Sequence, residues 1–236
     1  MTGYERFSKL AVDEIIPLFK RLDHEGFSQY AIDSINGISS SQKKPNLTEE
    51  EDFYVKILRH FGEINKSLET LEHIPIFISS FRKSKAYREA GITDTIHLRY
   101  HIEHYLQENY ILLSRVQKFM GWLSHSLKNE GRLRESLFVS GLLKTFEDSM
   151  KNLKLVRGDH VHETRYDDNI LNRATMLELA GQYKRDKDLS FGATMSYKLA
   201  KKEWSERIKK NNQDLRKSLD MIFEGLAPIV FPSPRE

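Results

Sequence analysis

A chain of 236 residues with 39 % hydrophobic and 30 % charged residues is too apolar to stay disordered, and it is long enough for one large helical domain or two small ones. The absence of cysteine excludes a disulfide scaffold, a cysteine nucleophile and thiolate-bound metals. The net charge of +3 does not by itself indicate nucleic-acid binding.

The N-terminal sequence and the hydropathy pattern indicate the cellular compartment in which we expect the protein. Residues 1–6 are polar and lead straight into a helical pattern, without the basic start and continuous apolar stretch of a signal peptide. The longest apolar clusters are interrupted by Pro, Ser or Arg, and they fall short of the roughly 20 residues that a membrane span requires. We therefore expect a cytoplasmic protein with no membrane partner.

The first 46 residues predict helices followed by a loop. Apolar residues recur at three-to-four spacing over residues 4–22, which predicts a helix with one buried stripe. A weaker helical pattern covers residues 26–38. Residues 39–46 are rich in Ser, Lys, Pro and Asn and have the composition of an exposed loop.

The next predicted helix has a clear start signal. Thr48 and Glu51 form a capping box, in which the hydroxyl and the carboxylate satisfy first-turn amides. Because proline interrupts helices, this helix is predicted to end near Pro75. Residues 76–88 then predict a short helix that stops at Gly91.

Two long helices joined by a short loop are predicted in the middle of the chain. A helical period is held without a breaker over residues 93–127, the longest helix that the sequence predicts. Residues 128–131 form the turn, and residues 133–156 predict an antiparallel return helix.

The last third of the chain is predicted to be partly irregular. Residues 157–196 lose clear periodicity, whereas residues 196–224 carry one apolar stripe and predict a final helix. Pro232 and Pro234 mark a frayed tail.

Together these elements predict an all-α fold: an antiparallel up-and-down helical bundle with additional N-terminal helices. The predicted division places an N-terminal helical part at residues 1–92, which packs on or extends a bundle at residues 93–236. A single domain overall is the alternative.

The densest group of reactive side chains lies where the return helix is predicted to give way to a loop. Histidine is the usual general acid or base near neutral pH, and arginine can hold a phosphate through two parallel hydrogen bonds. Alternatively, an arginine at a helix C-terminus and a capping glycine are ordinary helix-end features, with the histidines as loop residues. The group comprises Arg157, Gly158, Asp159, His160, His162 and Glu163.

The spacing of Arg157 and His162, with four residues between them, resembles the R-x4-6-H motif of the HEPN superfamily. The resemblance covers roughly residues 93–224. It implies an antiparallel helical bundle. Many members are ribonucleases of toxin–antitoxin and antiviral systems, and they commonly dimerise so that two protomers form one metal-independent site.

The resemblance also implies a mechanism and a set of partners. An RNA 2′-hydroxyl would attack the adjacent phosphate to give a cyclic phosphate, while His162 moves protons and Arg157 stabilises the phosphoryl oxygens. His160 would be an alternative base and Asp159 an orienting carboxylate. The implied partners are RNA, a second copy of the chain and an antitoxin or regulatory protein, and no metal or cofactor is expected.

The densest basic stretch of the sequence lies in the last predicted helix. Its cations are interleaved with acidic residues, so it is either a solvated helix face or a surface for a substrate such as RNA. For the second interpretation, Lys201 and Lys202 are the candidate substrate-binding residues.

Four polar residues share one face of the longest predicted helix, at spacings of four, three and four. They are an ordinary polar face, the lining of the Arg157 cleft, or part of a transition-metal site, although the motifs of zinc proteases and di-iron bundles are absent. A second possible metal group combines the downstream histidines and aspartates. The first set is His97, His101, His104 and Glu108; the second is His160, His162, Asp167 and Asp168.

Aromatic residues are frequent on the same predicted helix. At helical spacing such residues are more often core or dimer interface than base-stacking platforms, and we interpret them so. They are Tyr100, Tyr105, Tyr110, Phe119 and Trp122.

The leading hypothesis from the sequence is a HEPN-like endoribonuclease of a toxin or antiviral-defence system, with Arg157 and His162 as the catalytic pair. The first rival is a non-catalytic helical module that binds RNA, a nucleotide or a protein partner. The second rival is a metal-dependent enzyme that uses the histidines.

Overall fold

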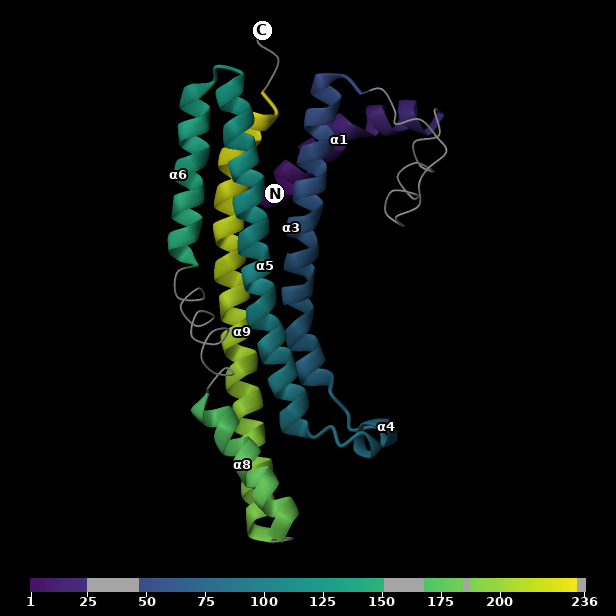
Figure 1. Cartoon of the computed structure of the whole chain (residues 1–236), viewed down its shortest axis with the longest axis vertical. Helices are drawn as coiled ribbons and strands as arrows, with labels where there is room; N and C mark the ends of the chain where they lie inside the picture. The colour runs from purple at the N-terminus through teal and green to yellow at the C-terminus, as the bar shows by residue number, and fades with distance from the viewer. Residues whose placement is uncertain (25–46, 151–167, 185–186, 233–236) are drawn as a thin grey trace. The chain divides into compact units, whose positions relative to one another are not determined.

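The computed structural model describes residues 1–24, 47–150, 168–184 and 187–232, and α-helix is the only regular structure of more than a turn among them (Figure 1). The predicted all-α helical bundle is confirmed for this part of the chain. The helices are α1 (Gly3–His24), α3 (Glu49–Ser80), α4 (Lys85–Glu89), α5 (Asp94–Asn129), α6 (Leu133–Ser149), α8 (Asn169–Lys184) and α9 (Lys187–Val230).

The chain divides into two compact units that are discontinuous in sequence. The first unit takes in Met1–Glu63, Lys118–Leu143 and Leu219–Glu236. The second unit takes in Ile64–Gln117 and Lys144–Ser218. Each unit therefore contains residues from both sides of the sequence-based boundary between residues 92 and 93.

The core of the first unit is aromatic. The ring centroids of Phe7 and Phe223 lie 4.8 Å apart, and those of Phe61 and Phe223 lie 5.2 Å apart at nearly a right angle. Tilted and edge-to-face pairs of this kind add to the free energy of burying the rings. The capping box that opens α3 is present, since the amide of Thr48 donates to Oε2 of Glu51 at 2.8 Å and the amide of Glu51 donates to Oγ1 of Thr48 at 3.2 Å.

Helix α3 does not end near Pro75, and the separate helix predicted over residues 76–88 is wrong. The helix continues to Ser80, and only Lys85–Glu89 forms the short α4, before Gly91 turns the chain with φ 70°. A proline leaves the carbonyl four residues earlier without its helical partner. That carbonyl, on Leu71, accepts a hydrogen bond of 2.8 Å from Nδ2 of Asn212 on α9. The side chain of a distant helix thus replaces the bond that Pro75 removes.

Replacing Asn212 with alanine is expected to lower the free energy of unfolding by about 1–3 kcal/mol, because the buried carbonyl of Leu71 loses its donor. The loss should shrink when Pro75 is also replaced with alanine, since residue 75 then supplies an amide. Urea unfolding of the two single variants and the double variant measures this coupling. Gln213→Ala, at an exposed position beside Asn212, is the control; equal losses in both backgrounds would contradict the explanation.

The helical hairpin in the middle of the chain is confirmed. Helices α5 and α6 are joined by a short turn in which Gly131 adopts φ 77°, a conformation that favours glycine. The predicted return helix extended to residue 156, but α6 ends at Ser149 and Met150 lies in a turn. Residues 151–156 lie outside the described part of the chain.

The prediction of an irregular segment over residues 157–196 is wrong for its described part, which forms α8 and the first turns of α9. Gly181 suggests a helix break in the sequence, but it allows close helix packing instead. A Cβ on Gly181 would lie 3.1–3.3 Å from atoms of Ser190 on α9. Asp168 caps α8, because its Oδ1 accepts the amides of Ile170 at 3.1 Å and Leu171 at 2.9 Å.

Candidate ligand-binding cavity

The residues of the predicted catalytic pair lie outside the described part of the chain. Arg157 and His162, with Asp159 and His160 as secondary candidates, fall in residues 151–167.

A cavity of about 740 Å³ lies in the second unit, between the C-terminal end of α3, residues 81–93 and the first turns of α5. This volume is in the range of cavities that hold small organic ligands. Polar groups at the cavity come from Ser80, Arg82, His97 and His101. The remaining lining is aromatic or aliphatic: Phe77, Phe81, Tyr87, Ile92, Ile96 and Tyr100.

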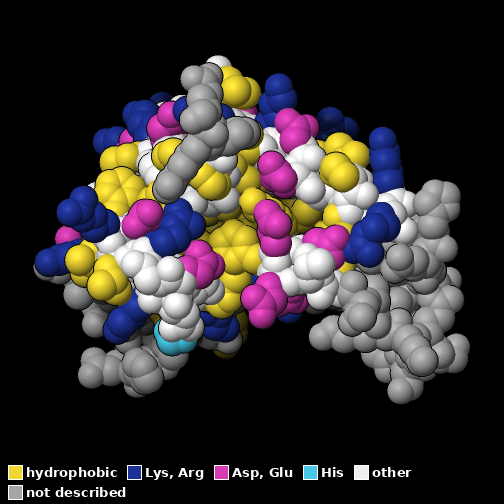
Figure 2. All heavy atoms as spheres, turned by 90° about the horizontal axis from the view of Figure 1, so that it is seen from above, with side chains coloured by type: hydrophobic (Ala, Val, Ile, Leu, Met, Phe, Trp, Pro, Cys, Tyr) yellow, Lys and Arg dark blue, Asp and Glu magenta, His cyan; other side chains and the backbone are white. Residues whose placement is uncertain are grey.

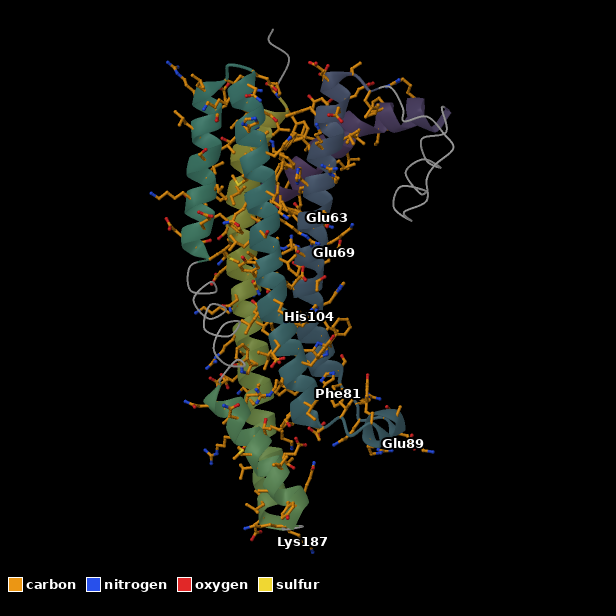
Figure 3. All side chains as sticks on the ribbon, in the orientation of Figure 1. Glu63, Glu69, Phe81, Glu89, His104 and Lys187 are labelled. Carbon is orange, nitrogen blue, oxygen red and sulfur yellow. The ribbon has the colours of Figure 1, made fainter. Side chains whose placement is uncertain are left out.

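Helical spacing explains why these side chains converge. Phe77 and Phe81 are four residues apart on and just after α3, so they lie one above the other. His97 and His101 have the same spacing on α5. Figure 3 shows Phe81 at the end of α3, Glu89 on α4 and His104 further along α5. Rings from two helices that run in opposite directions therefore meet at the edge of the cavity.

The rings form a connected series of contacts along α3 and α5. Phe81 and His97 stack with centroids 3.6 Å apart and planes at 19°. Phe77 and His101 stack at 5.7 Å and 24°. His73 and His104 continue this ring series beyond the cavity lining, the first through Phe77 and the second through Tyr100.

Several rings of this series are exposed, although aromatic side chains are usually buried. Phe77 is 53 % exposed and Tyr100 is 63 % exposed. Of the α5 aromatics interpreted as core or dimer interface, Tyr105 and Phe119 are buried core residues, whereas Tyr100 is exposed and is not part of the core. Exposed apolar surface of this kind commonly marks a binding site.

The two histidines of the cavity are held in their neutral form. Their Nε2 atoms lie 3.1 Å apart. Burial, reinforced by His97 and His104, lowers the pKa of His101 to about 4, and burial with the charge of Lys201 lowers the pKa of His97. At neutral pH both imidazoles are therefore uncharged and present rings and hydrogen-bonding nitrogens to a ligand.

Acidification is expected to destabilise the fold through His101. The unfolded state takes up a proton near the ordinary pKa of 6.5, whereas the folded state does so near 4. The contribution of His101 to stability is thus present above pH 6.5 and is lost as the pH falls towards 4. Thermal unfolding between pH 7 and pH 4.5 should show a smaller decrease in Tm for His101→Gln than for wild type. His125→Gln, at an exposed position, should retain the wild-type slope.

The segment between α3 and α5 that contributes to the cavity is rich in basic residues, of which Arg82 lines the cavity. Residues 82–88 carry four basic side chains and no acidic one. Lys83 and Lys85 form long, exposed ion pairs with Asp94 at 3.9 Å and Glu89 at 3.7 Å. Arg82 is exposed and forms no ion pair within the described part of the chain. Its guanidinium is therefore available to an anionic ligand.

The two lysines predicted to bind substrate differ in their positions. Lys201 donates to the carbonyl oxygen of Ser79 at 3.2 Å, next to the cavity lining, and its charge acts on His97. Lys202 is exposed and does not line the cavity. The structure thus brings together His97 and Lys201, which the sequence analysis placed in separate groups.

Glu108 does not belong to the histidine group. It is only 7 % exposed, accepts a hydrogen bond of 2.6 Å from Oγ of Ser67 and lies 3.6 Å from Arg115. The interpretation of these four residues as an ordinary polar face is therefore wrong for Glu108. Among the described residues no group of three or more His, Asp or Glu side chains could hold a metal ion.

The part of the cavity that α3 contributes is not predicted from the sequence, because Pro75 predicts a helix end and so places Phe77 and Phe81 in another helix. The available signal was the position of Phe77 beside the buried stripe that contains Ile74 and Ile78. A large ring off that stripe is exposed if the helix continues.

No protein-family model, curated protein or solved structure matches the chain. Within the described ranges, no helix combines the length and the apolar character that crossing a membrane requires.

Proposed function

We propose that the chain is a helical binding module whose cavity takes a nucleotide, either free or as part of RNA. The observation that carries the proposal is the combination at one cavity of exposed ring faces with a guanidinium that forms no ion pair among the described residues. Phe77 offers a π-face to a base, and Arg82 offers a guanidinium to its phosphate. Base–aromatic stacking contributes about 1–3 kcal/mol per base.

Charge favours an anionic ligand at this cavity. Residues 82–88 carry four basic side chains and no acidic one, and the charge of Lys201 acts on His97. On the face that Figure 2 shows, the hydrophobic side chains in the middle are bordered by both acidic and basic side chains.

Calorimetric titration with AMP, GMP, CMP and UMP tests the proposal. Saturable binding by wild type that weakens in Arg82→Ala, and is unchanged in Arg134→Ala at an exposed position of the other unit, would support it. Absence of binding by folded protein for all four nucleotides would refute it.

A second candidate function is a metal-independent endoribonuclease of HEPN type. It is favoured by the spacing of Arg157 and His162 after a helical hairpin, in a chain whose described part is all-helical. The two functions are compatible, since the cavity would bind RNA that the motif cleaves. Incubation of RNA with wild type in excess chelator should yield cyclic phosphate ends. Light scattering should find the homodimer that a composite site requires, and an antitoxin or regulatory protein would be its further partner.

A further inference from the structure

We infer that the natural occupant of the cavity is a single-stranded nucleic acid, with one base at the cavity and the next on the Tyr100–His104 pair. This inference rests on the proposed nucleotide site and extends it to a second base. The ring series is longer than the cavity, because His104 stacks on Tyr100 without lining the cavity.

The rings provide two adjacent surfaces, and Tyr100 borders both of them. The Phe77–His101 stack belongs to the cavity lining. The Tyr100 and His104 rings lie 6.3 Å apart with planes at 18°, one turn apart on α5, where Tyr100 is exposed and His104 is partly exposed. Because Tyr100 borders the cavity and is 63 % exposed, a strand with its first base at the cavity can place its second base against this pair.

Single strands, and not duplexes, fit such a surface. The faces of bases are covered in a duplex and are free in a single strand, where aromatic side chains bind them with little sequence preference. The rings here lie next to basic side chains, with Arg82 at the cavity and Lys201 acting on His97. Charge complementarity at Arg82 and Lys201 thus favours a polyanion that carries flat rings.

The test is the dependence of affinity on oligonucleotide length. Dissociation constants are measured for AMP, the dinucleotide ApA and the hexanucleotide of adenylate with wild-type protein. If a second base stacks, affinity rises by about 5-fold to 150-fold from AMP to ApA. His104→Ala should remove most of that gain and leave AMP binding intact, whereas His104→Phe should keep the gain. His125→Ala is the control for loss of an exposed histidine.

Other outcomes decide between the inference and the function on which it rests. If AMP binds but ApA binds no more tightly, the proposed stacking of a second base is wrong and the nucleotide site stands. The same conclusion follows if the gain in affinity from AMP to ApA persists in His104→Ala. Failure of AMP and of all oligonucleotides to bind would overturn both. Equal or tighter binding of duplex RNA, or displacement of the hexanucleotide by anionic vesicles at equal charge, would also overturn the inference. A parallel series of deoxyadenylates distinguishes RNA from DNA as the source of the strand.

Discussion

Replacing Phe77 with alanine is expected to weaken the binding of a mononucleotide by about 5-fold to 150-fold, the loss of one base–aromatic stack. The substitution should leave the fold intact, because the side chain is 53 % exposed and lies beside the buried stripe of α3. Titration of AMP into wild type and variant measures the change. Phe77→Tyr keeps the ring and should bind nearly as well as wild type.

The matched control for Phe77 is Phe138, which is 50 % exposed on α6 in the other unit. Phe138→Ala removes the same chemical group from a helix surface that does not line the cavity. Unchanged affinity in Phe77→Ala, or an equal loss in Phe138→Ala, would contradict the assignment of Phe77 to the nucleotide site.

Replacing His162 with alanine is expected to lower the rate of RNA cleavage by about 10²–10⁴-fold, which is the usual contribution of a general acid or base. Arg157→Lys should also be defective, since a point ammonium cannot reproduce the paired hydrogen bonds of a guanidinium. Rates and product ends are measured in excess chelator. Both variants should still bind the uncleaved RNA if binding takes place at the cavity.

RNA cleavage supports the HEPN mechanism only if substitutions in this chain change its rate. His160→Ala and Asp159→Asn should have smaller effects than His162→Ala, because the resemblance gives them secondary roles. Cleavage that persists at the wild-type rate in His162→Ala would argue against the HEPN mechanism. Nucleotide binding without any cleavage would leave the binding module as the function.

Local chemistry explains which elements could be predicted from the sequence. The start of α3 was predicted because a capping box involves residues only three apart, Thr48 and Glu51, and the hairpin of α5 and α6 because a helical period is uninterrupted on both sides of Gly131. Such signals depend on neighbours in the chain, so they do not require knowledge of the fold.

The wrong predictions share a different cause, which is compensation by a distant residue. Pro75 leaves the carbonyl of Leu71 without its helical donor, and the group that replaces this donor comes from Asn212, far along the chain. Gly181 likewise suggests a break until Ser190 is seen to fill the space beside it. The sequence around Pro75 or Gly181 does not indicate that Asn212 or Ser190 will lie beside it.

In the candidate cavity, too, some features follow from neighbouring residues and others depend on distant ones. The shared face of His97 and His101 followed from helical spacing alone. Their stacking partners Phe77 and Phe81 come from another helix, and the neutral state of the imidazoles depends on the burial that those rings produce. Which rings meet is therefore decided by tertiary packing.

The continuity of α3 through Pro75 has a consequence for the affinity of any ligand. With 3.6 residues per turn, each residue is rotated by about 100° from the last, so an unbroken helix fixes the direction of Phe77 relative to its neighbours in the core. Ile74 and Ile78, on either side of the proline, are fully buried. The outward direction of Phe77 is thus decided when the core packs. A ligand meets a preorganised surface and loses little affinity to ordering it, which is the usual penalty of flexible binding segments.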